Sequence, residues 1–180
     1  DADLSFAIAL GAKPVLNTPN QVARWRAAGG GLCDVMLNTG MNRLGIGEDD
    51  LTPDLLDGLD IDIVMSHLAS ADEDSWQNES QLDLFMEMSD AVAARRRSLA
   101  NSAGIMLGAD YHFDLTRPGL ALYGGVPCED LADSICQVAH LEAQVLQVGQ
   151  ITAGDVVGYN ATFEADSDMR TAVVSLGYAD

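Results

Sequence analysis

The stretch Ile61-Asp-Ile-Val-Met-Ser-His-Leu68 and the helical pattern after it decide the fold. Residues 61–65 are typical of a short buried strand, which Ser66 and His67 follow directly. We expect Asn78 to cap a long helix with residues 95–97, three arginines, at its solvated C-terminal end. Its inward side recurs every 3.6 residues, at Leu82, Phe85, Met86, Ser89, Val92 and Ala93. A strand followed by a helix is the repeating unit of a parallel α/β sheet or barrel.

A second helix is indicated closer to the beginning of the sequence. Thr18 followed by Pro19 is typical of a helix start, and Gln21 completes a capping box. Val22 and Trp25 have the spacing of a buried side. Three glycines then end the helix.

Further strands and helices continue this alternation. Apolar residues predict strands near residues 14–17, 33–37, 98–101 and 113–123. Thr52-Pro53 predicts the start of another helix. The pattern over the first 130 residues therefore predicts an α/β fold.

Beyond about residue 130 the pattern changes. Residues 136–148 form a long run rich in Val, Leu and Gln, and a turn is expected over residues 149–154. Residues 156–163 and 170–176 then have the composition of strands with no helix between them. Such a succession predicts an antiparallel β unit.

Composition excludes several classes of protein. Of the 180 residues 48% are hydrophobic, too many for a disordered chain, and the formal net charge is −19. Such an acidic surface repels phosphate backbones, so we expect no nucleic-acid partner. No apolar run approaches the roughly 20 residues that span a bilayer, and no signal peptide is present, so we expect no membrane contact.

Cysteine usage indicates a reducing compartment. Cys33, Cys128 and Cys136 are odd in number and lack the spacing of metal ligands. We therefore expect no disulfide scaffold and no metal site, a cytoplasmic location, and three small buried side chains.

Candidate functional residues follow the predicted strands. In parallel α/β folds, reactive side chains lie just beyond the carboxyl ends of the strands. Arg43, His67, Ser102 and Arg117 with Gly119 occupy such positions. Two arginines, a histidine, a serine and a glycine suit a ligand that carries a phosphate and a carboxylate.

Each of these residues also has an ordinary structural explanation. Arg43 could pair with a nearby surface acid, and His67 could be a hydrogen-bonded core residue. Ser102 and Gly119 could simply form turns. The recurrence at successive strand ends favours a site.

Six segments, in order along the chain, resemble motifs of the alanine racemase family. They are Asn38-Thr-Gly-Met-Asn-Arg-Leu-Gly45, Ser66-His-Leu-Ala-Ser-Ala-Asp72, Arg97-Ser-Leu-Ala-Asn-Ser-Ala-Gly104, Arg117-Pro-Gly-Leu-Ala-Leu-Tyr-Gly124, Val157-Gly-Tyr-Asn-Ala-Thr-Phe163 and Gly177-Tyr-Ala-Asp180. The family fold is an eight-stranded α/β barrel followed by a β domain. The resemblance therefore implies that residues 1–130 are the cofactor-binding, C-terminal portion of a (β/α)8 barrel, and that residues 131–180 begin an antiparallel β domain.

The resemblance also implies an activity. Family members interconvert L-alanine and D-alanine with pyridoxal 5′-phosphate by a two-base mechanism, which supplies D-alanine for peptidoglycan. By similarity, Tyr159 is the base that faces the L-enantiomer and acts in the site of the partner subunit of a homodimer. A free phenol titrates near 10, so it needs help. In the family that help comes through His67, which is linked to Arg117.

Further roles follow from the same motifs. Arg117 would face the pyridine nitrogen of the cofactor. Asn101, Ser102 and the backbone at Gly119 and Leu120 would complete the cofactor site, with Ser102 and the two backbone N–H groups holding the phosphate. Two other residues, Arg43 and Tyr178, would serve the substrate, the first by binding its carboxylate and the second by lining the passage to the site.

The match departs from the family at several positions. Lys13 is the only lysine and lies outside the family's cofactor-lysine motif, so we expect it to be structural. We expect an internal fragment that is inactive alone, with the cofactor lysine before Asp1 and more of the β domain after its end. Met36 replaces a lysine that is carbamylated in many relatives, and Asn38 replaces an aspartate. An anion such as chloride between Asn38 and Arg43 is one hypothesis for what supports that arginine.

Three alternatives stay open. A racemase of broader specificity would share every motif. A non-catalytic pyridoxal-phosphate-binding barrel protein would lack the β domain and the Tyr159 segment. A related decarboxylase would place an acid, rather than Arg117, at the pyridine nitrogen.

Overall fold

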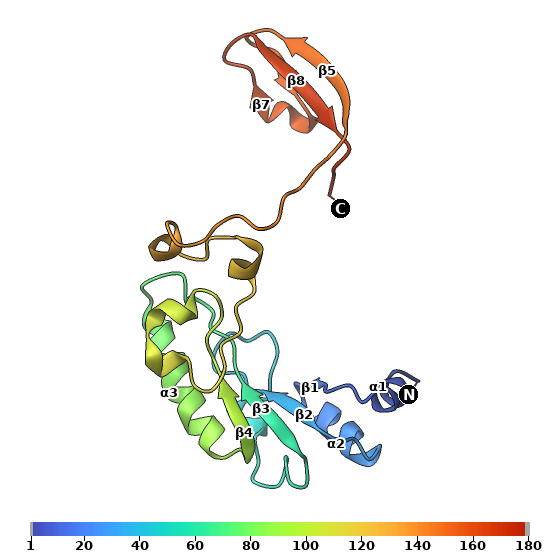
Figure 1. The fold of residues 1–180 in the computed structure, drawn as a ribbon, viewed down its shortest axis with the longest axis vertical. Helices are drawn as coiled ribbons and strands as arrows, with labels where there is room; N and C mark the ends of the chain where they lie inside the picture. Colours follow the sequence, from blue (N-terminus) through green and yellow to red (C-terminus); the bar gives the residue numbers. More distant parts are fainter. Residues whose placement is uncertain (1, 179–180) are drawn as a thin grey trace. The chain divides into compact units, whose positions relative to one another are not determined.

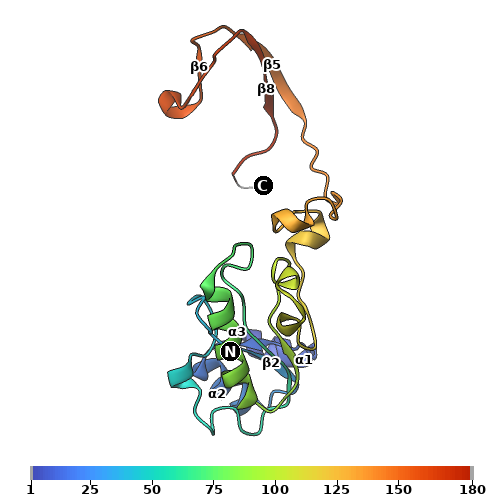
Figure 2. The same ribbon diagram turned by 90° about the vertical axis from the view of Figure 1, so that its left-hand side faces the viewer.

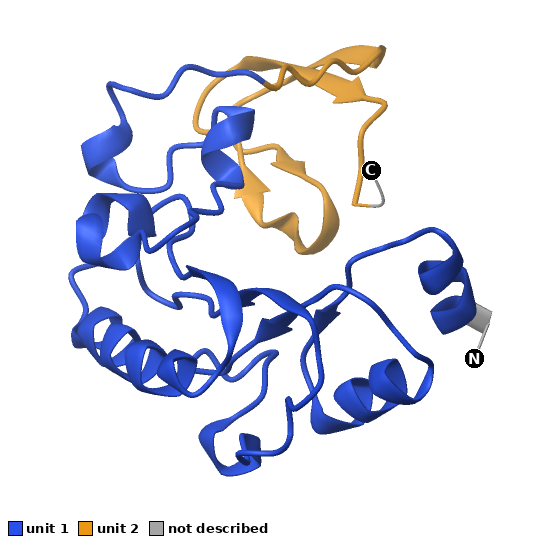
Figure 3. Cartoon of the chain, turned by 60° about the horizontal axis from the view of Figure 1, so that its bottom comes forward, with its two compact units in different colours: residues 1–138 blue, residues 139–180 orange. Residues whose placement is uncertain are grey.

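The computed structural model describes residues 2–178 (Figures 1 and 2). The chain divides into two compact units, Asp1–Val138 and Ala139–Asp180 (Figure 3).

A four-stranded parallel sheet forms the centre of the first unit. Its spatial order is the sequence order, β1-β2-β3-β4. Strands that are added one after another in the same direction form a sector of a barrel, whereas a doubly wound sheet reverses direction. The predicted parallel α/β fold is confirmed. The elements are α1 (Ala2–Ala9), β1 (Val15–Leu16), α2 (Pro19–Ala27), β2 (Cys33–Met36), β3 (Ile61–Met65), α3 (Trp76–Asp90) and β4 (Ala94–Ser98).

Helix α2 begins and ends as its sequence predicts. The Thr18 hydroxyl accepts a hydrogen bond from the Gln21 backbone nitrogen at 3.2 Å, and Val22 and Trp25 are buried. A Cβ atom at Gly30 would lie 2.2 Å from the Trp25 ring. The glycine therefore lets the chain turn back closely over the indole towards β2.

Helix α3 differs from the prediction at both ends. Ser75, not Asn78, is its N-cap, and the helix ends at Asp90. Asn78 lies buried in the first turn, where its amide nitrogen donates to the carbonyl oxygens of Ser70 and Glu73 at 3.1 and 3.0 Å. Of the predicted inward residues, Phe85 is fully buried but Met86 is 49% exposed.

The three arginines that were expected at the end of this helix lie in strand β4 instead. Arg95 pairs with Asp60, which directly precedes β3, at 2.8 Å. Arg96 pairs with Asp62, which lies in β3, at 2.7 Å. The strand expected near residues 98–101 lies over Ala94–Ser98 instead, so only Ser98 belongs to both.

Two other predictions are wrong. The segment expected to be a helix from Thr52 forms only turns, because Gly58 has a φ of +74° and β3 begins at Ile61. Residues 113–123 form no strand. Isolated hydrogen bonds tie this segment to the end of β4, among them Arg117 N to Ala100 O at 2.9 Å, in place of a regular ladder. A short 3₁₀ turn at Leu120–Tyr123 lies within residues 113–123, and others lie at Glu48–Asp50, Gly104–Leu107, Ala109–Tyr111 and Glu129–Leu131.

The second unit is antiparallel, as predicted. Strand β5 (Val145–Ile151) pairs with β8 (Met169–Val174), and β6 (Val156–Val157) pairs with β7 (Phe163–Glu164). Within the Val-, Leu- and Gln-rich run over residues 136–148, only the part from Val145 onward is strand, and residues 136–144 have no regular structure. Between β6 and β7 the chain forms a 3₁₀ turn at Tyr159–Ala161.

Burial of the cysteines is only partly as expected. Cys33 is buried in the core, and this burial raises the pKa of its thiol to about 11. Cys128 is half-buried and Cys136 is exposed, so the prediction is wrong for Cys136. The longest helix within residues 2–178, α3, has 15 residues, and no helix of this part of the chain could span a membrane.

Candidate active site

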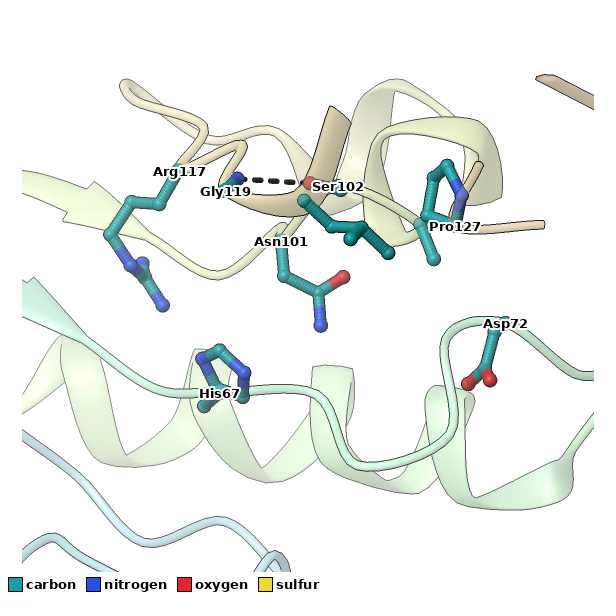
Figure 4. A pocket seen from close by; sticks show the side chains of 9 residues that line it. His67, Asp72, Asn101, Ser102, Arg117, Gly119 and Pro127 are labelled. Atoms are coloured by element: carbon teal, nitrogen blue, oxygen red, sulfur yellow. Dashed lines mark hydrogen bonds between the residues drawn. The ribbon is translucent and has the colours of Figure 1, made fainter. Parts of the chain in front are cut away.

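A pocket of about 310 Å³ lies beyond the carboxyl ends of β3 and β4 in the first unit. Six of the predicted site residues line it, namely His67, Asn101, Ser102, Arg117, Gly119 and Leu120, together with Asp72, Ala103 and Pro127. Figure 4 shows the His67, Asn101 and Arg117 side chains directed into the same space, with Asp72 and Pro127 at the other end of the view. The structure thus brings together predicted site residues that are up to 53 positions apart (from His67 to Leu120).

Arg117 is fixed by groups from both strands. One guanidinium nitrogen donates to the Ser98 hydroxyl and another to the Ser66 carbonyl oxygen. Ser98 in turn donates to the Leu115 carbonyl oxygen at 2.6 Å. Burial lowers the pKa of Arg117, but an arginine retains its charge in proteins. The pocket therefore contains a fixed positive charge.

His67 stands next to this charge. Burial lowers the pKa of the imidazole, and the positive charges of Arg117 and Arg43 lower it further. Even at the ordinary pKa of histidine, near 6.5, the imidazole is neutral in most molecules at pH 7. His67 is therefore neutral at neutral pH.

Ser102 is the point where backbone donors meet. Its hydroxyl oxygen accepts hydrogen bonds from the backbone nitrogens of Gly119, at 2.9 Å, and Ala121, at 3.3 Å (Figure 4 shows the first). Two N–H groups beside a serine hydroxyl provide donors for an anion. The sequence predicted donors at Gly119 and Leu120; the structure directs the N–H of Ala121 at the serine, and Leu120 lines the pocket.

Asn101 joins the loops that follow β3 and β4. Its amide nitrogen donates to the Leu68 carbonyl oxygen at 3.3 Å, and its amide oxygen accepts from Gly104 N at 2.9 Å. A Cβ atom at Gly104 would lie 2.6 Å from the Leu68 side chain. This close approach keeps the two walls of the pocket together.

Arg43 lies in the loop after β2, exposed and outside the pocket lining. Asn38 organises this loop: its oxygen accepts from Asn42 N at 2.9 Å, and its nitrogen donates to Asn42 Oδ1 at 3.0 Å. An aspartate could not make the second bond. One of the two amide hydrogens of Asn38 bonds within the loop, and the chloride hypothesis stays a prediction.

Tyr159 and Tyr178 belong to the second unit. Their side chains are 94% and fully exposed, respectively. Tyr159 occupies the turn between β6 and β7, in which Asn160 has a φ of +60°. The final two residues of the Gly177-Tyr-Ala-Asp180 segment lie outside the described residues.

Lys13 makes ion pairs away from the pocket. Its amino group lies 3.1 Å from Asp34 and also pairs with Asp62, and these partners raise its pKa. This agrees with the structural role expected for the residue. Across residues 2–178, no group of His, Cys, Asp or Glu side chains could hold a metal ion.

One buried residue near the site was missed from the sequence. Gln81 of α3 is 1% exposed and bonds to the backbone on both sides of Leu68. A signal was available, because Gln81 precedes the fully buried Phe85 by four residues and so lies on the same face of the helix.

The donor set fits pyridoxal phosphate. Ser102 and the two backbone N–H groups suit its phosphate, and the guanidinium of Arg117 suits an uncharged ring nitrogen, which can accept a hydrogen bond. Ser102, Gly119 and Arg117 line one pocket, and the Ala121 N–H donates to Ser102.

Comparison with known proteins adds an independent observation. The family model of the alanine racemase N-terminal domain matches residues 1–127, and that of the alanine racemase C-terminal domain matches residues 138–180. The biosynthetic alanine racemase of Agrobacterium fabrum is 42% identical over 177 residues, which cover 93% of this chain and 45% of that protein. The alanine racemase of Acidiphilium cryptum is 41% identical over 178 residues, covering 93% and 50%.

Solved structures give the same result. The biosynthetic alanine racemase of Pseudomonas aeruginosa superimposes with a TM-score of 0.77 at 32% identity, covering 99% of this chain and 53% of that one. The alanine racemase of Bartonella henselae, with covalently bound pyridoxal phosphate, gives 0.69 at 31% identity, covering 98% and 52%. The chain spans about half the length of the relatives it matches. With family models matching most of its residues, the chain belongs to the alanine racemase family.

Proposed function

We propose that the protein containing this chain is an alanine racemase that interconverts L-alanine and D-alanine with pyridoxal 5′-phosphate by a two-base mechanism. The observation that carries the proposal is that Ser102, Gly119, Arg117 and a neutral His67 line one pocket, with backbone N–H groups of Gly119 and Ala121 directed at the serine, in a chain of this family.

Ser102, Gly119 and Ala121 would hold the phosphate. The two N–H groups that now donate to the serine oxygen would donate to phosphate oxygens, and the serine hydroxyl would add a third donor. Arg117 would hold the pyridine nitrogen and Asn101 would line the cofactor. When bound, the cofactor disperses the negative charge that develops at Cα of the substrate.

The charge state of the pocket suits proton abstraction by a phenol. Arg117 stays charged, and this charge together with burial keeps His67 neutral. A neutral imidazole can accept a hydrogen bond from a tyrosine hydroxyl and so assist its deprotonation. We assign that phenol to Tyr159, acting on L-alanine in the site of the partner subunit of a homodimer. Its side chain, 94% exposed in the second unit, is accessible for this role.

The substrate carboxylate would be bound by Arg43, the exposed arginine whose charge acts on His67. Tyr178 would line the passage through which alanine reaches the site. We assign the base for D-alanine to a lysine outside this chain, since Lys13 is held by Asp34 and Asp62. We further infer a cytoplasmic enzyme that supplies D-alanine for peptidoglycan.

The test uses the full-length protein that contains this chain, purified with pyridoxal 5′-phosphate. Formation of D-alanine from L-alanine, and much slower formation of D-serine from L-serine, supports the proposal. Equal rates on both substrates would replace it with a racemase of broad specificity. Cofactor binding without any turnover would overturn it in favour of a binding protein.

A further inference from the structure

The side-chain amide of Gln81 makes two hydrogen bonds to the backbone of the loop that carries His67, one as donor and one as acceptor. Its nitrogen donates to the His67 carbonyl oxygen at 2.9 Å, and its oxygen accepts from the Ala69 backbone nitrogen at 2.8 Å. These two backbone groups flank Leu68, so the amide fixes the peptide on each side of one residue. The His67 backbone is therefore held from helix α3.

The same amide is joined to the loop after β2. Its nitrogen lies 3.4 Å from Thr39 Oγ1, which is 2.7 Å from Ser66 Oγ, and that hydroxyl donates to the Leu37 carbonyl oxygen at 2.9 Å. Ser66 has one hydroxyl proton, which the Leu37 bond uses, so Thr39 must donate to Ser66 and accept from Gln81. The donor and the acceptor of each of these hydrogen bonds are therefore determined.

The three side chains of this hydrogen-bond network are all buried. Gln81 is 1% exposed, Ser66 1% and Thr39 3%. In surroundings without water, a lost donor leaves its partner unsatisfied, so the arrangement is sensitive to a single change. The hydrogen-bond network also includes Arg117, which donates to the carbonyl oxygen of Ser66.

We propose that Gln81 is a positioning residue for racemisation: its amide sets the place of the His67 ring and couples the His67 loop to the loop that carries Arg43. The inference rests on the proposed function for its effect on turnover. Gln81 acts through His67, and the role requires no contact with substrate or cofactor.

Two variants of the full-length enzyme separate this role from simple stabilisation. Gln81→Leu removes all three hydrogen bonds of the amide at nearly constant side-chain size. We expect kcat/KM for L-alanine to fall by about 10-fold to 100-fold, as displacement of a catalytic group by roughly 1 Å does. Gln81→Glu keeps an acceptor for Ala69 but, when ionised, cannot donate to His67 or Thr39.

The pH profile provides the specific signature. The charged groups that face His67 are Arg117 after β4 and Arg43 after β2, Asp72 lines the same pocket, and Gln81 is neutral. A less buried ring has a higher pKa, so the acid limb of kcat/KM moves upward in Gln81→Leu. The added negative charge moves it further in Gln81→Glu.

Asn78→Leu is the matched control. Asn78 is another buried amide of α3 with two bonds to backbone carbonyl groups, but these belong to Ser70 and Glu73, beyond His67. We expect this variant to lose stability without moving the acid limb. An equal upward movement of the limb in Asn78→Leu would show a general structural effect and overturn the proposal.

Amide hydrogen exchange supplies a readout independent of turnover. Without cofactor or substrate, Gln81→Leu should exchange faster than the parent in peptides covering residues 66–71 and 37–42, whereas Asn78→Leu should leave residues 37–42 unchanged. Unchanged exchange in both peptides of Gln81→Leu overturns the proposal even if the enzyme racemises. Faster exchange in a protein that does not racemise supports the positioning of His67 and counts against the proposed function alone.

Discussion

The hydroxyl oxygen of Ser102 accepts a hydrogen bond of 2.9 Å from the backbone nitrogen of Gly119. Ser102 follows β4, and Gly119 lies in the segment that runs back along the end of that strand. The bond therefore closes one wall of the pocket and aligns a backbone donor with a side-chain hydroxyl. The same serine accepts from Ala121, so three potential donors to a phosphate lie together.

Replacing this serine should weaken cofactor binding. In Ser102→Ala a hydrogen bond to a charged phosphate is lost, which is worth about 1.5–3 kcal/mol, or roughly 10-fold to 100-fold in Kd. The measurement is a titration of the cofactor-free, full-length enzyme with pyridoxal 5′-phosphate, followed by absorbance. Ser80→Ala, at an exposed position of α3, is the control and should bind the cofactor as the parent does. Equal affinities for all three proteins would remove Ser102 from the phosphate site.

Acid should destabilise the first unit through Asp62. Hydrogen bonds from Arg96 and then Lys13 lower the pKa of this carboxyl group from 3.8 to about 2. Because the folded-state pKa is below the unfolded one, the contribution to stability is complete above about pH 4 and is lost as the pH falls from about 4 to about 2. Urea unfolding of the full-length protein across this range should show the loss.

Two variants isolate this contribution. Asp62→Asn should be less stable at pH 7 and should lose less stability on acidification than the parent. Asp60→Asn removes an ion pair with Arg95 in which both side chains are 57% exposed, and such pairs contribute little. A parallel acid dependence in the parent and in Asp62→Asn would assign the loss to other groups.

Gly45 should be required for the loop that carries Arg43. Its φ is +122°, and a Cβ atom there would lie 2.6 Å from the backbone of both Leu37 and Asn38. Backbone atoms cannot move aside as a flexible side chain can, so we expect Gly45→Ala to cost at least about 1–3 kcal/mol. It should also raise KM for alanine by displacing Arg43.

Gly47→Ala is the control for that substitution, because a Cβ atom there meets nothing within 4 Å. Thermal unfolding and KM measured on both variants separate strain in this turn from a general intolerance of the loop. If Gly45→Ala keeps the parent KM, the loop does not position the substrate carboxylate.

Periodicity predicted much of the fold because local sequence determines it. The strand at β3 and the buried side of α2 were correct, since apolar spacing and capping residues act over a few positions. The arginines of β4 were placed wrongly because Asp60 and Asp62, which pair with two of them, lie more than 30 positions away in the sequence. Pairing between strands is not a local property.

The sequence predicted only part of the site, because the remaining contacts are also not local. Polar residues after strands mark His67, Asn101 and Ser102, and the pocket does contain them. The N–H of Ala121 has no side-chain signature, since any residue provides a backbone donor. Gln81 was missed because a glutamine on a helix is usually solvated, and only the folded loops show what it binds.

Tyr159 of the second unit should be essential for the reaction that starts from L-alanine. Tyr159→Phe removes the hydroxyl while keeping the ring, and loss of a general base costs about 10²-fold to 10⁴-fold in rate. D-alanine formation by the full-length enzyme measures this. Tyr123→Phe, at an exposed position of the first unit, should retain the parent rate.

Mixed dimers test whether Tyr159 acts in the partner's site. Neither Tyr159→Phe nor Arg117→Leu should have appreciable activity alone. If the tyrosine of one subunit completes the Arg117 pocket of the other, a mixed dimer has one site with both defects and one site with neither. Unfolding and refolding the two variants together should therefore restore part of the activity. If the tyrosine acted within its own subunit, every site would carry one defect, and the mixture would remain inactive.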